Sequence, residues 1–271
     1  GYMKFIVNLS FGLGSFCAAR KIIDEAGTDN VVCVFADTKY EDEDTYAWGR
    51  AAAKSLGCEI VELADGRNPW QVFKDERFIG NSRLDPCAKI LKRRLIDRYL
   101  TDMYAKDSVN IIFGIHISEK DRFERIDKKT GKRLGIKPRM EEKGWHVRAP
   151  LCESPYLSLS DMETMATDAG LWKQKLYVLG FPHANCGGRC VKQGQSGWAL
   201  LYKTMPERFI EVRDNEEEMR RHLGKDVSML TETRKGKKYS LTLVELQRRI
   251  DAKCEVPQFD FGGCACFAGD E

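Results

Sequence analysis

The chain has 271 residues, of which 42% are hydrophobic and 31% are charged. That length accommodates one large α/β domain, or a domain with an appendage. Its 44 Lys and Arg against 41 Asp and Glu give a net charge of +3, too small to indicate nucleic-acid or membrane binding from charge alone. No segment approaches the roughly 18 consecutive apolar residues of a membrane span, and the first residues lack the pattern of a secretory signal. We therefore expect a soluble, cytoplasmic protein with no membrane partner.

The first half of the chain alternates between strand and helix patterns. Strands that alternate with helices predict an open, mostly parallel sheet with helices on both faces, and hence the α/β fold class. Glycines close two of the helices, at Gly27 and Gly57. We predict strands at 4–9, 31–36, 59–63 and 109–115, and helices that end at residue 26 or span 42–56, 69–78 and 87–105.

The second half is less regular. Residues 119–148 are dense in charge and predict an exposed loop, or alternatively a loop that grips an anionic substrate. We predict a returning strand at 149–151, and a helix at 158–169 opened by a capping pattern of Ser160 and Glu163. Beyond Tyr177 the pattern changes, and helices are predicted at 198–205, 215–223 and 241–252. The predicted organisation is an α/β domain at 1–178 and a helical, cysteine-rich region at 179–271.

The segment between the first strand and the first helix is rich in glycine. It reads Ser10-Phe11-Gly12-Leu13-Gly14-Ser15. Glycines allow several main-chain N–H groups to converge, the helix N-terminus adds partial positive charge, and the serine hydroxyls can donate to phosphate oxygens. The segment is neither a Walker loop nor a dinucleotide-binding G-x-G-x-x-G motif. It is a candidate phosphate site, with a plain structural turn as the alternative.

Four segments, in order, resemble the PP-loop ATP pyrophosphatase superfamily, in its phosphoadenylyl-sulfate (PAPS) reductase-like branch. The glycine-rich segment is similar to the PP-loop pattern Ser-Gly-Gly-x-Asp-Ser and to its Ser-Phe-Gly form in the reductases. Residues 35–46, 86–100 and 114–122 are similar to the second-strand motif, the cysteine-plus-basic helix and the substrate-binding segment of the same reductases. The resemblance covers about residues 4–125 and implies an adenine nucleotide alpha hydrolase-like fold.

The resemblance implies that residues 10–15 and Gly114 bind the nucleotide. Two positions depart from the pattern, because Gly14 replaces the usual Asp and Phe11 replaces a glycine. Phosphate binding by main-chain N–H groups survives both changes, provided that the Phe11 side chain points away from the nucleotide. The residues expected to bind nucleotide are Ser10, Phe11, Gly12, Leu13, Gly14, Ser15, Asp37, Thr38 and Gly114.

Other polar residues in these segments are given candidate roles. Asp37 follows the second strand, a position that suits contact with ribose or Mg²⁺, and a helix N-cap or a turn former is the alternative. Lys89 and Lys92 are spaced to share one face of a helix, and with Arg122 they could neutralise phosphate or sulfate. Each cation by itself is alternatively a surface charge. The candidate catalytic residues are Cys87, Lys89 and Arg122.

Ten cysteines are an excess for a cytoplasmic chain, where a disulfide framework would be kept reduced. Cys17, Cys33 and Cys58 lie in apolar segments and are interpreted as buried small hydrophobic residues. Two tight pairs beside glycines provide four thiolates, a complete ligand set for a metal ion or a cluster. A redox thiol pair and idle buried cysteines are the alternatives. The predicted ligands are Cys186, Cys190, Cys264 and Cys266.

Four thiolates do not distinguish zinc from an iron–sulfur cluster. The resemblance implies a [4Fe-4S] cluster, because adenylyl sulfate reductases and several PP-loop sulfurtransferases, including the type that puts sulfur into DNA backbones, carry one. Cys87 is then a fifth ligand candidate or a persulfide-carrying thiol. The second cysteine of the reductase motif is Ala88 here, and the cysteine tail of the thioredoxin-dependent reductases is absent.

Three functions are open at this point. The first is an ATP-dependent, adenylating enzyme of the sulfurtransferase type with Mg²⁺ and an iron–sulfur cluster. The others are a reductase of adenylyl sulfate or phosphoadenylyl sulfate, and a non-catalytic nucleotide-binding module with a structural zinc. The acceptor could be tRNA, DNA, a nucleobase or a small metabolite, and we expect a sulfur or electron donor protein and a homo-oligomer. Residues 185–209 resemble PP-loop proteins of phages and bacteria. A protein that is encoded by a phage and acts in the host cytoplasm is therefore one of the alternatives for its location.

Overall fold

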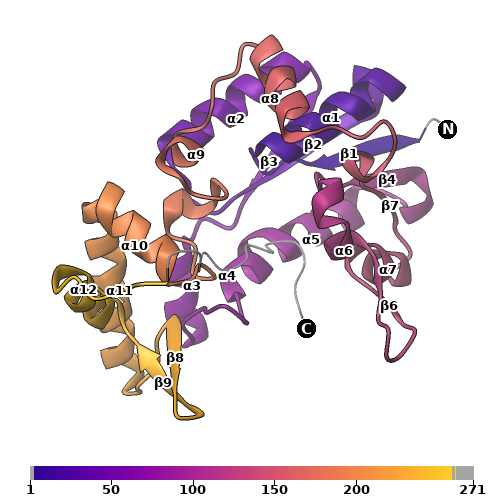
Figure 1. The fold of residues 1–271 in the computed structure, drawn as a ribbon. Helices are drawn as coiled ribbons and strands as arrows, with labels where there is room; N and C mark the ends of the chain where they lie inside the picture. The colour runs from indigo at the N-terminus through magenta and orange to yellow at the C-terminus, as the bar shows by residue number, and fades with distance from the viewer. Residues whose placement is uncertain (1–2, 258–259, 261–271) are drawn as a thin grey trace. The chain divides into compact units, whose positions relative to one another are not determined.

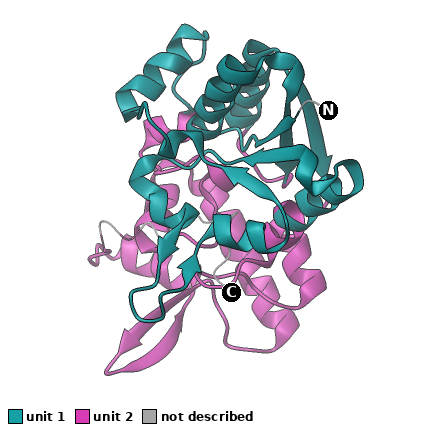
Figure 2. Cartoon of the chain, turned by 90° about the vertical axis from the view of Figure 1, so that its right-hand side faces the viewer, with its two compact units in different colours: residues 1–37, 43–64, 93–174 teal, residues 38–42, 65–92, 175–271 magenta. Residues whose placement is uncertain are grey.

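A computed structural model of the chain describes residues 3–257 and 260. The chain forms two compact units, which Figure 2 colours separately. Unit 1 consists of residues 1–37, 43–64 and 93–174, and unit 2 of residues 38–42, 65–92 and 175–271. The last junction, at 174–175, lies close to the predicted boundary at 178. Unit 2 also takes two short segments from the first half of the chain.

Unit 1 contains a five-stranded parallel sheet (Figure 1). Its strands are β1 (Lys4–Asn8), β2 (Val31–Asp37), β3 (Glu59–Ala64), β4 (Val109–Ile112) and β7 (His146–Arg148). The order β3-β2-β1-β4-β7 places the first strand in the middle. β2 is buried along almost its whole length, as expected for an inner strand of a sheet covered on both faces. The predicted α/β class with an open, mostly parallel sheet is confirmed.

Helices cover both faces of this sheet. They are α1 (Leu13–Ala26), α2 (Glu43–Leu56), α5 (Arg94–Met103) and α8 (Leu159–Asp168), and short 3₁₀ turns lie at Thr28–Asn30, Lys106–Ser108, Ile117–Glu119 and Pro150–Cys152. Successive side chains of a strand point to opposite faces. Val7, Cys33 and Phe35 therefore pack together with α1, α2 and α8 in one core. Helix α5 contacts β2 and β3 from the other face (Figure 1).

The charged stretch 119–148 is folded, which corrects the prediction of an exposed loop. It contains α6 (Lys120–Phe123), an antiparallel pair of β5 (Arg125–Ile126) and β6 (Arg133–Leu134), α7 (Ile136–Glu142) and the edge strand β7. Its buried side chains include Phe123, Ile136 and Trp145. These are separated by charged residues that pair at the surface, such as Arg133 with Glu124, so no hydrophobic period is visible in the sequence.

The strand predicted at 149–151 is also wrong. The strand lies at 146–148, and residues Pro150–Cys152 form a 3₁₀ turn. Because proline has no N–H to donate to a neighbouring strand, the ladder does not continue through Pro150.

The cap of α8 differs from the prediction by two residues. Ser158 Oγ accepts the N–H of Asp161 at 3.0 Å, and the Asp161 carboxylate accepts the N–H of Ser158 at 2.8 Å. This is the reciprocal arrangement of a capping box, with a shorter acid than the usual Glu. The predicted cap at Ser160 and Glu163 is therefore wrong.

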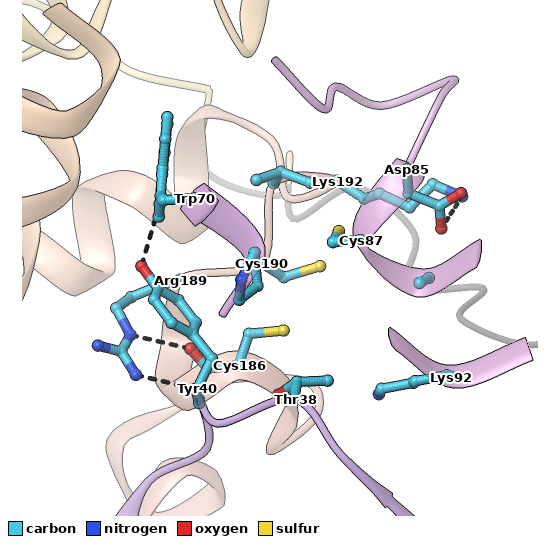
Figure 3. Close-up of a pocket in the computed structure, with 13 residues that line it drawn as sticks. Thr38, Tyr40, Trp70, Asp85, Cys87, Lys92, Cys186, Arg189, Cys190 and Lys192 are labelled. Carbon is cyan, nitrogen blue, oxygen red and sulfur yellow. Dashed lines mark hydrogen bonds and ion pairs between the residues drawn. The ribbon is translucent and has the colours of Figure 1, made fainter. Parts of the chain in front are cut away.

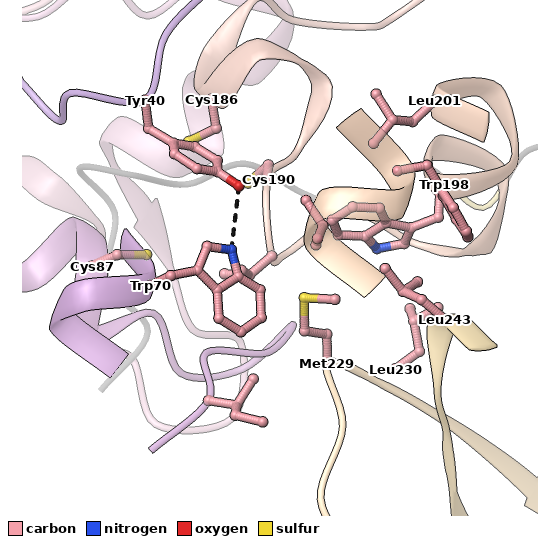
Figure 4. Packing of buried hydrophobic residues seen from close by; sticks show 14 of the residues in the cluster. Tyr40, Trp70, Cys87, Cys186, Cys190, Trp198, Leu201, Met229, Leu230 and Leu243 are labelled. Atoms are coloured by element: carbon pink, nitrogen blue, oxygen red, sulfur yellow. Dashed lines mark hydrogen bonds between the residues drawn. The ribbon is translucent and has the colours of Figure 1, made fainter. Parts of the chain in front are cut away.

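Unit 2 combines helices with an antiparallel hairpin. Its elements are α3 (Pro69–Glu76), α4 (Pro86–Ala88), α9 (Lys175–Leu179), a 3₁₀ turn at Asn185–Gly188, α10 (Gln195–Thr204), α11 (Pro206–Leu223), β8 (Leu230–Arg234), β9 (Lys237–Leu241) and α12 (Leu243–Asp251). Trp198, Phe209 and Leu241 are fully buried in its core, part of which Figure 4 shows. The prediction missed the hairpin because both strands are mostly polar and exposed. Cys264 and Cys266 lie outside the described residues.

The helix predicted at 87–105 is divided. α4 is followed by a π-helical turn at Lys89–Arg93, and α5 begins at Arg94. A π turn holds more residues than an α turn, so positions three apart do not share a face. Lys89 is accordingly exposed, whereas Lys92 is only 5% exposed. The shared face predicted for these two lysines is not formed.

Within the part of the chain that the structure describes, no helix has the length and apolar character needed to cross a bilayer.

Candidate functional site

The loop between β1 and α1 leaves the middle of the sheet. β1 pairs with β2 along one edge and with β4 along the other. The chain continues from β1 toward β2, and β4 belongs to the other half of the sheet, so β1 and β4 flank a topological switch point. Open α/β sheets bind ligands at such a point, beyond the carboxyl ends of the strands. The predicted nucleotide loop lies there, as does Gly114, two residues after β4.

Two glycines allow the loops after β1 and β4 to pack tightly. A Cβ atom on Gly114 would lie 2.5 Å from the main-chain N and Cα of Ser15. A Cβ atom on Gly14 would lie 2.7 Å from the carbonyl oxygen of Gly114. Real Cβ atoms do not come this close to a main chain, so this packing requires both glycines. Gly14, which departs from the PP-loop pattern that this segment resembles, is thus required by the packing of the two loops.

The two serines of the loop bond to each other. Ser15 Oγ accepts the N–H of Ser10 at 3.1 Å, lies 3.2 Å from Ser10 Oγ and donates to the carbonyl oxygen of Gly12 at 3.1 Å. Ser15 is buried, and Ser10 is half-buried. These bonds shape the loop around the start of α1. The first-turn N–H groups of a helix have no partner within the helix, so those of Leu13 and Gly14 are the feature suited to an anion.

The side chain of Phe11 points into the core. Its φ angle is 61°, and its ring stacks on Phe35 with 3.6 Å between the centroids. A Cβ atom on Gly49 of α2 would lie 2.0 Å from the ring, so the glycine provides the space that the ring occupies. Gln174 Nε2 donates to the Phe11 carbonyl oxygen at 2.7 Å and fixes the main chain. As predicted, the aromatic ring does not fill the loop.

Two buried side-chain oxygens in this unit accept no hydrogen bond within the described residues. They are Oδ1 of Asn8, the last residue of β1, and Oε1 of Gln174, whose amide holds the loop. A buried polar atom without a partner costs free energy, so such atoms call for an explanation. A donor group on a bound molecule would provide one. No sequence motif marks either residue, and the prediction missed both.

Asp37 and Arg122 have protein partners. Asp37, at the end of β2, accepts a hydrogen bond from the Tyr46 hydroxyl at 2.6 Å. Because α2 begins at Glu43, Asp37 is not its N-cap, and that alternative is wrong. Arg122 Nη1 donates to Glu119 Oε1 at 2.9 Å within the same short segment.

In unit 2, three cysteines line one pocket of about 20 Å³ (Figure 3). Cys87 comes from α4, and Cys186 and Cys190 come from the loop that follows α9. The predicted catalytic thiol and two predicted metal ligands are thus brought together, while the exposed Lys89 is not part of the lining. The pocket is also lined by Thr38, Tyr40, Pro69, Trp70, Asp85, Ala88, Lys92, Arg189, Val191 and Lys192.

The loop of Cys186 is held in an unusual conformation. Cys186 has a φ angle of 58°, and the two glycines after it are also left-handed. The Cys186 N–H donates to Glu41 Oε2 at 2.7 Å, and Arg189 Nε donates to the Cys186 carbonyl oxygen at 3.1 Å. Arg189 also donates to the carbonyl oxygen of Tyr40 at 2.8 Å and lies 3.7 Å from the centre of its ring. Glu41, Tyr40 and Arg189 therefore position this thiol.

Charged side chains are buried beside the thiols. Lys192 and Asp85 form an ion pair at 3.5 Å, with side chains that are 6% and 8% exposed. Burial raises the pKa of the Cys87 thiol well above its ordinary range, Cys186 and Asp85 raise this pKa further, and Lys92 acts against them. Cys87 is therefore a neutral thiol at neutral pH in this structure. A bound metal ion would favour its thiolate.

The donor set partly fits the predicted metal site. Three soft thiols in a buried pocket with cationic neighbours match the chemistry of a thiolate-ligated centre. Among residues 3–257 and 260, however, no three Cys, His, Asp or Glu side chains lie in an arrangement that could hold a metal ion. The remaining two predicted ligands, Cys264 and Cys266, fall outside the described residues.

Several residues of this pocket were missed by the sequence prediction. Tyr40 and Trp70 form a wall in which Trp70 Nε1 donates to the Tyr40 hydroxyl at 3.2 Å (Figure 4). Asp85 and Lys192 supply the buried ion pair. Asp85 and Lys192 each lie two residues from a predicted site residue, Cys87 or Cys190, and this short distance in sequence could have indicated them. An ion pair between residues that are far apart in sequence cannot be identified without the fold.

No model of a known protein family matches the sequence, and no curated protein matches it significantly. Among solved structures, a phosphoadenylyl-sulfate (PAPS) reductase from Candida auris, determined as a phosphate complex, is similar. The two chains are 15% identical, with a TM-score of 0.43 over 66% of this chain and 79% of the reductase. The α/β assignment rests on the parallel sheet itself.

Proposed function

We propose that this chain is a nucleotide-dependent enzyme of sulfur chemistry. The observation that carries the proposal is the glycine loop at the sheet's switch point, with a main chain left open by the inward-turned Phe11. That position and the uncapped first turn of α1 suit the phosphate groups of ATP or an adenylyl compound. The resemblance of the same loop to a PP-loop supports this assignment.

With ATP, the proposed reaction is an adenylation. An oxygen of the acceptor attacks the α-phosphorus, the bond to the β-phosphate oxygen breaks, and pyrophosphate leaves. The main-chain N–H groups of Leu13 and Gly14 would stabilise the charge that develops on the departing pyrophosphate. Asp37, at the carboxyl end of β2, would contact ribose or Mg²⁺. A sulfur nucleophile then displaces AMP from the adenylated acceptor.

The thiol pocket of unit 2 supports the assignment to sulfur chemistry. Cys87, Cys186 and Cys190 share this pocket with buried Lys92 and Lys192, and a positively charged side chain such as Lys92 suits a bound anionic sulfur species. Cys186 and Cys190, with Cys264 and Cys266, would hold a [4Fe-4S] cluster or zinc. If one of these four cysteines were not a ligand, the open iron of the cluster would supply a binding site for sulfide, and Glu41 and Arg189 would keep the Cys186 main chain in place.

A second candidate is a reductase of adenylyl sulfate or its 3′-phosphorylated form, and the presence of several thiols in one pocket favours it. Cys87 would lose its proton and attack the sulfur of the substrate, and the enzyme would then carry an S-sulfo group. AMP would leave from adenylyl sulfate, and adenosine 3′,5′-bisphosphate would leave from its 3′-phosphorylated form. A second thiol, Cys186 or Cys190, would then attack the Cys87 sulfur and release sulfite. The resulting disulfide would need two electrons from an external dithiol reductant.

Product analysis separates these reactions. Anaerobically purified protein is incubated with ATP and Mg²⁺, or with adenylyl sulfate and a dithiol, and pyrophosphate, AMP and sulfite are measured. Pyrophosphate with AMP supports the adenylating enzyme, and sulfite supports the reductase. Nucleotide binding without any of these products would contradict both and would indicate a binding module.

A matched pair of lysine variants tests the role of the pocket. Lys92→Met removes a buried charge from the pocket lining, whereas Lys89→Met removes an exposed charge three residues earlier. We expect product formation to fall at least about tenfold in Lys92→Met, an effect of the size of one lost charged contact, and to change little in Lys89→Met. Equal losses would mean that the pocket is not the site of the sulfur chemistry.

A further inference from the structure

Two cysteines of unit 1 lie outside the sites described above. Cys33 is on β2, and Cys58 immediately precedes the neighbouring strand β3. Cys33 pairs with Ile60 in the parallel ladder, and Cys58, two residues before Ile60, has its side chain on the same face. The two sulfur atoms are 3.3 Å apart, and both residues are free thiols. The strand register thus brings two thiols within reach of one bond.

The two thiols have different surroundings. Cys33 is fully buried, in the core between the sheet and α1, while Cys58 is half-buried at the end of the α2–β3 connection. The hydrogen bond from Cys33 lowers the pKa of Cys58, and the nearby Arg20 also lowers it. The same contact, together with burial, raises the pKa of Cys33. Cys58 is therefore the accessible thiol with more thiolate character, and Cys33 is a protected partner behind it.

We propose that Cys33 and Cys58 form a redox-active pair that a peroxide oxidises to a disulfide and a dithiol reduces again. The Cys58 thiolate attacks one peroxide oxygen, the O–O bond breaks, and hydroxide leaves and takes up a proton to become water. Cys58 is then a sulfenic acid. The Cys33 sulfur attacks Cys58 sulfur, the S–O bond breaks, and a second water leaves with the Cys33 proton. The thiols together lose two electrons, and the peroxide gains them.

The geometry requires only a small movement. A disulfide needs about 2.05 Å between its sulfur atoms, so the pair must close by somewhat more than 1 Å, which side-chain rotation on adjacent strands can provide. The pair sits near the amino ends of the strands, whereas Asp37 and the β1–α1 loop lie at their carboxyl ends. The thiol pair is thus separate in position from the proposed nucleotide site.

Peptide mapping tests the pair directly. Full-length protein is titrated with hydrogen peroxide, remaining thiols are alkylated, and the chain is cut with trypsin without reduction. Trypsin places Cys33 in the peptide 22–39 and Cys58 in the peptide 55–67, each with a single cysteine. We expect these two peptides to appear joined, with a mass two hydrogen atoms below their sum, and to separate after treatment with a dithiol. Joined peptides are expected at peroxide levels that leave Cys17 and the exposed Cys254 unoxidised.

Two variants complete the test. In Cys33→Ser, the sulfenic acid of Cys58 has no partner thiol with which to form a disulfide. We therefore expect a sulfenic-acid reagent to trap it and, without the reagent, further oxidation to sulfinic acid. In Cys58→Ser, we expect Cys33 to stay reduced at the same peroxide level because it is buried. Separate oxidation of both peptides in the wild-type chain, or pairing of Cys58 with a different cysteine, would overturn the proposal. The wild-type map alone decides this, whether or not a variant folds.

Discussion

At the scale of single residues, the direction of one side chain, Phe11, decides whether the main chain of the β1–α1 loop is open or covered. Phe11 stands where the PP-loop pattern Ser-Gly-Gly-x-Asp-Ser has a glycine, and a φ angle of 61° is uncommon for any non-glycine residue. The conformation is kept because the ring is buried on Phe35 and because Gly49 leaves space for it. The main chain of the loop, which carries the N–H groups proposed to bind phosphate, is therefore not covered by this ring.

The pairing of Phe11 with Gly49 can be tested by a double-mutant cycle. Gly49→Ala places a methyl group where the ring lies, so we expect it to lower the free energy of unfolding by about 1–3 kcal/mol, as overpacking does. Phe11→Leu vacates part of the ring's volume, so the double variant should be more stable than the sum of the two losses predicts. Denaturant unfolding of the four proteins measures this. Strict additivity of the two losses would contradict the contact.

Also at this scale, residue identity predicted the location of the loop but not its detail. The glycines and serines of residues 10–15 indicate a tight turn before a helix from sequence alone. The sequence did not indicate that Ser10 and Ser15 bond to each other or that Gln174 holds the Phe11 carbonyl. These contacts join positions that only the fold brings together.

At the scale of elements, helix α11 carries a buried acid. Glu216 is fully buried, and its two carboxylate oxygens accept the N–H groups of Met229 at 3.0 Å and Leu243 at 2.8 Å. Leu243 is the first residue of α12, so this one side chain joins α11 to the hairpin region and to the next helix. Burial raises the pKa of Glu216 to about 7, although the two hydrogen bonds act in the opposite direction.

This raised pKa predicts a pH dependence of stability. Below about pH 4.5, Glu216 is protonated in both the folded and unfolded states and imposes no cost. As the pH rises toward 7, the unfolded chain ionises first, so stability falls, by on the order of 3 kcal/mol at most from this group. Glu216→Gln should remove that component, whereas Glu218→Gln, an exposed acid on the same helix, should not. Urea unfolding at pH 5 and pH 8 measures the free energy of unfolding at each pH. An equal change in this free energy between the two pH values in the wild type and both variants would contradict the assignment.

The same scale shows which elements a sequence pattern reveals. α1, α2, β1, β2 and β3 follow apolar periods and were predicted to within about a residue, whereas β4 ends three residues before the predicted end at Ile115. β8 and β9 were missed, and β7 was placed three residues too late, because short strands with charged or polar residues lack such a period. The π turn at Lys89–Arg93 was missed because its backbone changes the helical period without any proline or glycine to mark it.

At the scale of the whole molecule, the chain forms two units with separate hydrophobic cores. Val7, Phe16 and Phe35 belong to one core, and Trp198 and Phe209 to the other. The proposed phosphate-binding loop lies in unit 1, and the described thiols of the candidate metal site lie in unit 2. The two binding properties should therefore be separable by substitution.

Paired variants test this separation. Ser15→Tyr disrupts the bonds that shape the loop, so we expect nucleotide affinity to fall at least tenfold while the metal and sulfide content of anaerobically purified protein is unchanged. Cys186→Ser should lower the metal and sulfide content and leave the nucleotide affinity unchanged. Equilibrium dialysis with labelled nucleotide and metal analysis measure both, with circular dichroism as a check of folding. If Ser15→Tyr does not fold, the half-buried Ser10→Tyr replaces it. Loss of both properties in a folded variant would show that the two sites depend on each other.

The sequence by itself determined the α/β class, the main strands of the first half of the chain and the position of the glycine loop, because apolar periods and glycine positions are local properties of the chain. Only the tertiary structure decided that Cys87 shares a pocket with Cys186 and Cys190, that Lys92 is buried while Lys89 is exposed, and that Cys33 meets Cys58. The physical reason is that burial and charge pairing depend on neighbours distant in sequence, which strand register and helix packing select.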